Sequence, residues 1–568
     1  MSAASRAPGS GPIRGSKSPA PTGSGPGSPG GPSLGVFSRR SSGLVRELSL
    51  ADTAWYGILA AGALFGLLYV FPSPQVFLAG LNVPLSALIA MVLMIPVFAL
   101  YAGLGSAMPR MGGDYLYQSR AIHPAVGFTF TFAWEVFMWV TFTTTGGLVV
   151  ATLGLQPLLF NLGMQWESTA LIDAANWFGG ANGLLLTTLA LTAMAFAVTL
   201  RGIGAYRKIQ RYAIIPAIII SNVVLILLLL RSNASFVTQF NEFHQAATGD
   251  PNFHATVEAA AARGGFENPG FSFRYTVMFL SVVGLAWYVV FGAQGLLGET
   301  KQANNFGRLF RAFAIGGLYV GLVAWVIPTW LFQRMVGTEF MNAYAYAFTN
   351  GDVTSPAGAT IPSFAMMMTS SPIVSILLAL GFIAVGFYFT TCVFLNMTRV
   401  LSAMGMDRTI PEWFSRISER FHAPVNAAIF YFVLAVALNV LYRFDDEVKN
   451  TMVYGGAFTS VGVIAMSGLA GMLFAYRARH VYEVSPVAKH RILGLPLIAV
   501  AGAVTFLAAG GVTVMNLIYP ELGFTTTAAR LLLLLSLVVS AIWFFAYRAW
   551  QKRNGVDLDL AFRQLPPE

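Results

Sequence analysis

Twelve long apolar segments constrain the fold of this chain more than any other feature. Most hold about 20 or more residues with few charges, the length that a helix needs to cross a bilayer. In lipid every backbone polar group must be satisfied inside the segment, so only helices suit these lengths. The predicted spans, numbered 1 to 12 in chain order, are 53–78, 84–108, 125–153, 182–200, 211–231, 275–298, 310–334, 373–404, 424–442, 452–476, 493–516 and 529–549. We therefore expect an all-α integral membrane protein.

The composition excludes several other classes. Of the 568 residues only 10% are charged, whereas soluble domains carry about 25%. The single cysteine, Cys392, rules out a disulfide within one chain. All six histidines fall in polar connections between the predicted spans. We therefore expect neither a buried histidine-ligated metal centre nor a resident cofactor.

The net charge of +10 reflects topology and not a nucleic-acid partner. Connections 2–3, 4–5, 6–7, 8–9 and 10–11, together with the C-terminal tail, hold 21 of the 34 Lys and Arg residues. The opposite side holds seven, and the N-terminal tail holds the remaining six. Cytoplasmic loops carry the excess of basic residues. Both termini are therefore predicted to be cytoplasmic, in a multi-pass protein of the plasma membrane.

Two short polar segments interrupt the apolar pattern. The first hinge, residues 109–120, reads PRMGGDYLYQSR, and the second hinge, residues 399–411, reads RVLSAMGMDRTIP. Both resemble cytoplasmic loops of the amino acid–polyamine–organocation permeases. The matching residues are Pro109, Gly112, Gly113, Tyr115, Tyr117 and Arg120 in the first hinge, Ala403, Met404, Asp407 and Pro411 in the second, and also Glu299, Lys301 and the run 423–427.

The resemblance implies a five-plus-five inverted repeat, spans 1–5 against spans 6–10, with two further C-terminal helices. It divides the chain into the following segments: a disordered cytoplasmic tail (1–43), a permease core (44–480) with repeats at about 53–231 and 275–476, the last two helices (481–549) and a C-terminal tail (550–568). The tail 1–43 is rich in Gly, Pro, Ser and Ala, which cannot build a core. The long connections 232–274 and 335–372 are interpreted either as an external lid or as passive surface.

Glycine is frequent in the spans that open the two halves. The glycines are Gly57, Gly62 and Gly66 in span 1, and Gly284, Gly292, Gly295 and Gly298 in span 6. Such a pattern marks either broken helices around a midplane binding site or close helix packing. The resemblance favours broken helices.

In the fold that the resemblance implies, the break in span 1 frees N–H groups that suit a carboxylate. These groups belong here to Gly62, Ala63 and Leu64. Carbonyl groups near Trp287 to Phe291 would receive an ammonium group, and the aromatic faces of Trp287, Tyr288 and Phe291 could attract a cation. Ordinary bundle packing is the alternative for each of these aromatic residues.

The coupling ion remains open between sodium and a proton. By analogy with sodium-coupled relatives, Thr390 and Thr391 in span 8 would face carbonyls of Gly57 and Ala60 across the ion, although threonine hydroxyls also bond to their own helix. Glu135 is the only carboxylate well inside a span. Because charge is costly there, we interpret Glu135 as a proton carrier, with a protonated structural group as the alternative.

The sequence thus predicts a secondary active transporter of an amino acid or related small amine, ion-coupled or exchanging, that works by alternating access. A polyamine or organic cation permease is the first alternative, and Glu135 would then counter the cation. A membrane-embedded enzyme or sensor would need a catalytic cluster or a sizeable soluble domain, and neither is visible. The expected partners are a small-molecule substrate and the lipid bilayer, and the oligomeric state stays open.

Overall fold

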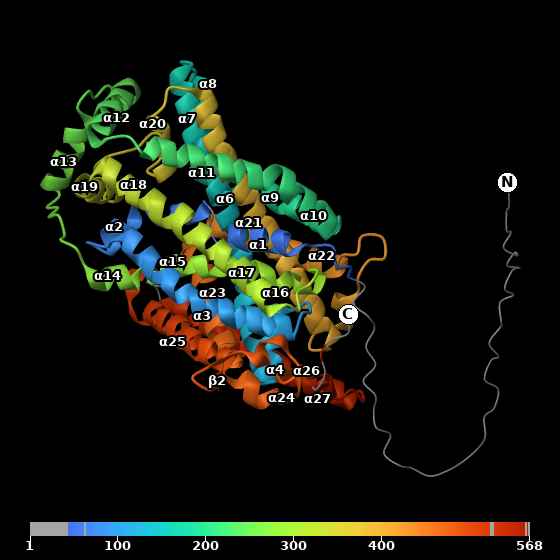
Figure 1. The fold of residues 1–568 in the computed structure, drawn as a ribbon. Helices are drawn as coiled ribbons and strands as arrows, with labels where there is room; N and C mark the ends of the chain where they lie inside the picture. Colours follow the sequence, from blue (N-terminus) through green and yellow to red (C-terminus); the bar gives the residue numbers. More distant parts are fainter. Residues whose placement is uncertain (1–43, 62–63, 523–526, 563–564, 566–568) are drawn as a thin grey trace, which may run out of the picture. The chain divides into compact units, whose positions relative to one another are not determined.

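The computed structural model describes residues 44–61, 64–522, 527–562 and 565, and these are helical almost throughout (Figure 1). Within these residues, ten helices are long and apolar enough to cross a membrane. They are Val83–Ala107, Pro124–Gln165, Ala181–Leu200, Ile203–Leu229, Phe306–Val336, Pro372–Met406, Val425–Phe444, Phe458–Arg477, Leu497–Ile518 and Arg530–Arg553. The prediction of an all-α membrane protein is confirmed.

The two predicted spans missing from that set are interrupted. Span 1 consists of α1 (Leu50–Ala60), the 3₁₀ turn η1 (Phe65–Tyr69) and α2 (Ser73–Phe77). Span 6 consists of α14 (Phe273–Met278), α15 (Leu280–Val283), the 3₁₀ turn η6 (Gly284–Tyr288), α16 (Val289–Leu296) and η7 (Leu297–Glu299). The glycine-rich segments are thus the ones that do not form continuous helices.

The other spans are built as follows. Span 2 is α3 (Val83–Ala107), and span 4 is α9 (Ala181–Leu200). Span 3 consists of α5 (Pro124–Phe130), η2 (Thr131–Phe137), η3 (Met138–Val140), α6 (Thr141–Leu148), η4 (Val149–Leu155) and α7 (Gln156–Gln165). Span 5 consists of α10 (Ile203–Ile209), η5 (Gln210–Ile214) and α11 (Ile215–Leu229). Span 7 consists of α17 (Phe306–Leu318), η8 (Tyr319–Val326) and α18 (Ile327–Val336). The last five spans are single helices: span 8 is α21 (Pro372–Met406), span 9 is α22 (Val425–Phe444), span 10 is α23 (Asp446–Arg477), span 11 is α25 (Leu497–Ile518) and span 12 is α26 (Thr527–Arg553).

Shorter elements fill the connections. The helices are α4 (Gly113–Ala121), α8 (Thr169–Gly179), α12 (Asn233–Thr248), α13 (Phe253–Arg263), α19 (Thr338–Thr349), α20 (Ile361–Met367), α24 (Arg479–Tyr482) and α27 (Leu558–Phe562). Three 3₁₀ turns are η9 (Glu412–Ser415), η10 (Pro486–Lys489) and η11 (Pro520–Leu522). The strands β1 (Arg491–Ile492) and β2 (Leu495–Pro496) form one antiparallel hairpin.

The predicted end of span 3 at residue 153 is wrong, because the helix continues to Gln165. Polar residues from Gln156 onward end the apolar run, and one of them bonds to a distant part of the chain: the Asn161 amide donates to the carbonyl of Met366 at 2.8 Å. Helix α8 then folds back against α7, where a Cβ on Gly163 would lie 2.7 Å from Ile172. The two helices form a hairpin (Figure 1).

The connections meet at two ends of the bundle. One end, called the basic end, is made of connections 2–3, 4–5, 6–7, 8–9 and 10–11. It is tied by bonds such as Arg120 to Asp407 and by the ring contact of Phe306 with His490. The other end, called the cap end, is tied by bonds such as Arg334 to the carbonyl of Leu230. Successive connections therefore alternate between the two ends of the bundle, as the sequence predicts.

Spans 1 and 6 run in opposite directions. At the basic end, the N–H of Leu48 donates to the carbonyl of Glu299 at 3.0 Å, so span 1 begins where span 6 finishes. At the cap end, the N–H of Ser272 donates to the carbonyl of Gly80 at 2.8 Å, so span 1 finishes where span 6 begins. This antiparallel pairing of the opening spans is the relation that an inverted repeat requires.

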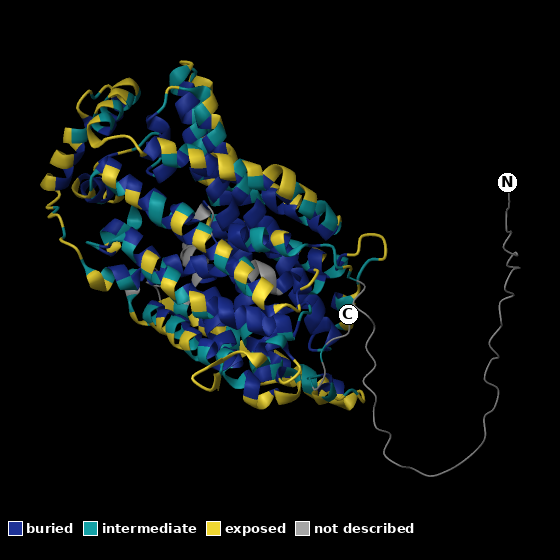
Figure 2. Cartoon of the chain, in the orientation of Figure 1, coloured by how far each residue is buried: buried dark blue, intermediate teal, exposed yellow. Residues whose placement is uncertain are grey.

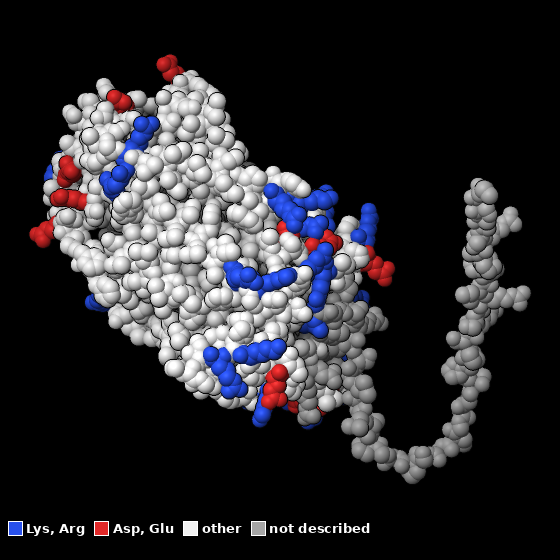
Figure 3. All heavy atoms as spheres, viewed as in Figure 1, with Lys and Arg blue, Asp and Glu red and all other residues white. Residues whose placement is uncertain are grey.

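The outer surface of the bundle suits lipid. Leu531, Leu535 and Ile542 on α26 are each more than half exposed. Buried residues gather at the centre of the bundle (Figure 2). On the face shown in Figure 3, a band free of charged side chains separates the cap end from the basic side chains near α10, α16 and α24. A multi-pass membrane protein accounts for both observations.

Candidate functional site

The two interrupted spans touch close to their breaks. Helix α1 ends at Ala60, and the N–H of Ala61 donates to the carbonyl of Gly57 at 3.0 Å. A Cβ on Gly57 would lie 1.9 Å from the backbone oxygen of Val289, the first residue of α16. Glycine at position 57 therefore permits direct contact between the two backbones.

The predicted carboxylate cradle falls at the break in span 1. Gly62 and Ala63 lie outside the described residues. Leu64 is 1% exposed, and its carbonyl accepts a bond from the N–H of Leu67 at 3.1 Å, which opens η1. A Cβ on Gly381 of α21 would lie 2.9 Å from Leu64. The two described residues that flank the break, Ala61 and Leu64, are therefore buried, with span 6 close to Gly57 and span 8 close to Leu64.

Trp287 packs between helices, which is the alternative that the sequence left open for it. Its ring is completely buried, and its indole N–H donates to the carbonyl of Ala90 in α3 at 3.2 Å. The side chain is therefore directed at span 2, where it joins two helices. This position does not favour an interaction of Trp287 with a substrate cation.

Tyr288 joins an aromatic cluster beside the break. Its ring centroid lies 6.2 Å from that of Phe142 and 6.4 Å from that of Trp139, both in span 3. Phe142 contacts Phe389 of α21 at 5.0 Å. Phe291 belongs to the first turn of α16, but its side chain lies outside the described part. Spans 3, 6 and 8 thus form an aromatic wall next to the break, of which the sequence identified only Tyr288.

The two threonines of span 8 bond to their own helix. The hydroxyl of Thr390 donates to the carbonyl of Gly386 at 3.2 Å, and that of Thr391 donates to the carbonyl of Phe387 at 2.8 Å. Thr390 lies against span 3, since a Cβ on Gly146 would be 2.2 Å from its Oγ1. Each hydroxyl oxygen keeps lone pairs that could bind a cation. Their role in sodium binding, with carbonyls of Gly57 and Ala60, stays a prediction.

A tyrosine pair that the sequence analysis missed joins spans 1 and 8. The hydroxyl of Tyr388 donates to the carbonyl of Tyr56 at 2.5 Å, and the hydroxyl of Tyr56 donates to the carbonyl of Cys392 at 2.9 Å. All three residues are buried. A hydroxyl of span 8 therefore does face a carbonyl of span 1, one residue before Gly57, but it belongs to a tyrosine.

Glu135 is completely buried inside the π-helical turn η2. Such turns inside α-helices are often found at functional sites. The helix begins at Pro124 as predicted, so at 1.5 Å per residue Glu135 lies about half-way across the hydrocarbon core. Its carboxylate is near enough to Tyr117 and Tyr431 to interact with both electrostatically. The surroundings thus combine burial with polar hydroxyl groups.

The structure brings the two hinges together. Arg120 donates to both carboxylate oxygens of Asp407, at 2.6 and 3.0 Å, and the Tyr115 hydroxyl donates to the same carboxylate at 2.9 Å. Gly112 adopts a φ of +100°, and a Cβ there would lie 2.6 Å from the Cβ of Ala403. The residues that carry the family resemblance in the two hinges therefore contact one another.

Two further ion pairs lie at the same end. Arg399 of α21 donates through Nε to Glu299 at 2.8 Å, and both side chains are at most 2% exposed. Arg211 of span 5 donates to Asp52 at the start of α1 at 2.5 and 2.6 Å. From the sequence, Arg399 and Arg211 are visible only as topology signals. Their partners lie at the ends of spans 6 and 1, which only the fold reveals.

A family model described as amino acid permease matches residues 55–542, which include both hinges, the whole of span 6 and span 1 from Trp55 onward. The chain belongs to the amino acid permease family. No curated protein is significantly similar to it. Family membership identifies the protein as a membrane transporter and confirms the resemblance seen in the hinges.

In this permease, the long connections 232–274 and 335–372 are folded. Helices α12, α13, α19 and α20 form a cap held by aromatic contacts. His244 stacks on Phe253 with centroids 4.0 Å apart, and His254 stacks on Phe340 at 3.8 Å. Phe71, which follows η1, packs against Phe364 of the cap at 5.6 Å. Contact with the end of span 1 favours the lid interpretation over a passive surface.

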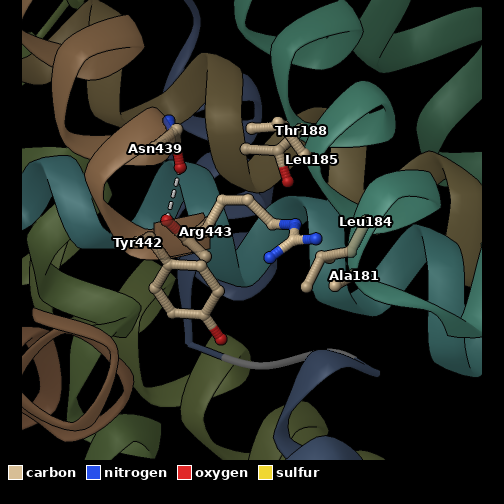
Figure 4. Close-up of a pocket in the computed structure, with 8 residues that line it drawn as sticks. Ala181, Leu184, Leu185, Thr188, Asn439, Tyr442 and Arg443 are labelled. Atoms are coloured by element: carbon tan, nitrogen blue, oxygen red, sulfur yellow. Dashed lines mark hydrogen bonds between the residues drawn. The ribbon is translucent and has the colours of Figure 1, made fainter. Parts of the chain in front are cut away.

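Two of the cavities formed by the described residues lie outside the region of the breaks. The larger, about 460 Å³, lies between α7, α12 and the segment that precedes α21. The smaller, about 70 Å³, lies between α6, α9 and α22. Figure 4 shows Arg443 reaching across the smaller cavity towards Leu184, with Thr188 beside it. Its volume leaves room for about two water molecules.

Proposed function

We propose that the permease is a secondary active transporter that moves an amino acid or a related small amine across the plasma membrane by alternating access. The observation that carries this proposal is the contact between the two interrupted spans. Breaks at matching positions of two repeats leave backbone groups that can bind a charged substrate at mid-membrane. The basic end then faces the cytoplasm, together with both termini, by the positive-inside rule.

The substrate would lie between the two breaks. Its carboxylate would accept bonds from the N–H groups of residues 62–64, at the positive end of a half-helix. Its ammonium group would donate to carbonyls of residues 287–291. Its side chain would pack against Tyr288 and Phe142 of the aromatic wall, which suits an apolar or aromatic group.

Alternating access requires the basic end to open. The ion pairs Arg120–Asp407 and Arg399–Glu299 join spans that must separate for a substrate to reach the cytoplasm. They would act as a gate that is closed in this conformation. At the other end, the cap over Phe71 would act as the second gate.

Transport in reconstituted vesicles tests this function. Purified permease in proteoliposomes would be offered a panel of labelled amino acids, with an imposed sodium gradient or an imposed proton gradient. We expect saturable accumulation of at least one amino acid under one of the two gradients, or exchange against internal amino acid. A permease that moves no member of the panel under any of these conditions would contradict the proposal.

An organic cation is the second candidate substrate, because Glu135 places a carboxylate deep inside the bundle. Glu135→Gln keeps the shape and removes the charge. Loss of pH-driven accumulation with retained exchange would assign the proton to Glu135. Weaker binding of amines at every pH would favour the cation permease. Wild-type behaviour in both assays would leave Glu135 a structural group.

A further inference from the structure

The larger cavity combines charged and polar groups at the cap end. Its walls come from the outer turns of α7, from α12, and from residues 367–371 before α21. Its volume of about 460 Å³ falls in the range of about 300–1,000 Å³ that is typical of ligand pockets. None of Leu64, Trp287 and Tyr288 lines it. The cavity is therefore distinct from the proposed central site.

Opposite charges line this cavity. Arg231 and Glu242 both belong to its walls. In the part of the chain that the structure describes, neither side chain makes an ion pair or a hydrogen bond. A guanidinium group binds a carboxylate with two parallel bonds, and a carboxylate binds an ammonium group. The pair therefore offers one partner for each end of a zwitterion.

Further polar groups match the same ligand. The Oε1 atoms of Gln165 and Gln239 are buried without a hydrogen-bond partner among the described residues. An ammonium group carries three donors, so it could satisfy these oxygens. Ser371 precedes the first turn of α21, and its side chain makes no capping bond there. The N–H groups of that turn favour an anion.

The rest of the wall is apolar. Met164, Phe243, Met367 and Met368 also line the cavity. Methionine side chains are flexible and fill the space beside ligands of different shape. We infer that the cavity is an outer binding site for a zwitterionic α-amino acid with an apolar side chain, which is held there before it enters the central site. This inference rests on the proposed transport function.

The test compares single variants in proteoliposomes. Arg231→Ala and Glu242→Ala would each be assayed for uptake of labelled leucine, methionine and phenylalanine. We expect the KM of each variant to rise at least about tenfold, because one charge-assisted bond to the substrate is lost. The kcat should stay within about twofold of the wild-type value. Arg443→Ala is the matched control, since this arginine lies in the last turn of α22 and lines the smaller cavity (Figure 4). It should keep wild-type kinetics.

The outcomes separate this inference from the proposed function. Wild-type KM in both variants, with normal uptake by the unchanged permease, would overturn the outer site alone. No uptake and no equilibrium binding of these three amino acids, with uptake of another member of the panel, would overturn the outer site alone. No uptake of any member of the panel by the unchanged permease would overturn both proposals. A phospholipid headgroup is also zwitterionic, so the assays would be repeated with and without phosphatidylethanolamine. A KM change seen only with that lipid would assign the cavity to lipid and overturn the inference.

Discussion

The contact between the two hinges can be weakened by one substitution. Asp407→Asn would remove the charge that faces Arg120, whose side chain is 4% exposed in the folded permease. Removing one partner of a buried ion pair costs about 3–5 kcal/mol, because the other charge stays in a poorly solvated place. If the basic end opens as a unit, the equilibrium constant for its opening should rise about 100- to 4,000-fold. Exposed ion pairs contribute far less.

Hydrogen–deuterium exchange measures this opening directly. Backbone amides of residues 109–121 and 399–411 should exchange faster by that factor in Asp407→Asn. Glu483→Gln is the control at the same end, because its pair with Arg479 is exposed, and it should leave exchange unchanged. The double variant Arg120→Gln/Asp407→Asn should regain most of the protection, since no charge is left uncompensated. Unchanged exchange in the single Asp407 variant would refute the role of this pair as a gate.

Three further predictions follow from the geometry. Gly57→Ala should cost about 1–3 kcal/mol and reduce uptake, whereas Gly510→Ala, whose Cβ meets nothing within 4 Å, should change neither thermal unfolding nor uptake. If sodium is the coupling ion, Thr391→Ala should raise the sodium concentration needed for half-maximal uptake, and uptake that persists in choline would exclude sodium. Burial lowers the pKa of His244 from 6.5 to about 4, so the folded cap binds fewer protons than the unfolded cap. Cap stability should be complete above pH 6.5 and fall by about 3 kcal/mol as the pH drops towards 4. Proteolysis of residues 233–263 should accelerate in acid. His244→Phe should reduce that pH dependence to the part contributed by His254, whose pKa is also lowered by burial.

Continuous apolar runs, together with the glycines and the family resemblance, predicted the larger features of the fold. Continuous runs of apolar residues are visible in any one sequence, and a helix is the only structure that such a run can form in lipid. The glycine-rich spans 1 and 6 were the ones expected to break, and both are interrupted. The structure adds the reason for Gly57 in particular, which is its contact with the backbone of Val289.

Side-chain partners could not be predicted in the same way. Tyr388 and Trp287 are both aromatic residues in apolar surroundings. Tyr388 bonds to span 1 and Trp287 bonds to span 2, but nothing in the neighbouring sequence indicates this difference. Arg399 and Glu299 are 100 residues apart, and they meet because spans 6 and 8 run in the same direction and both finish at the basic end. The extension of span 3 to Gln165 was missed because polar residues end its apolar run, and the bond from Asn161 to the carbonyl of Met366 joins distant parts of the chain.

The two ends of the bundle are closed by different physical forces, and this difference bears on how each could open. The cap is held by aromatic contacts such as that of Phe240 with Phe364, whose ring centroids are 5.7 Å apart. Opening the cap would cost about 25 cal/mol for each Å² of apolar surface that becomes exposed. The basic end is held by buried ion pairs, in which the cost of desolvating each charge offsets much of the attraction. Water that enters an opening basic end would rehydrate Arg120 and Asp407 and return part of that cost. The basic end therefore suits repeated opening during a transport cycle, while the cap would open only when a substrate or a change in pH compensates for the exposed rings.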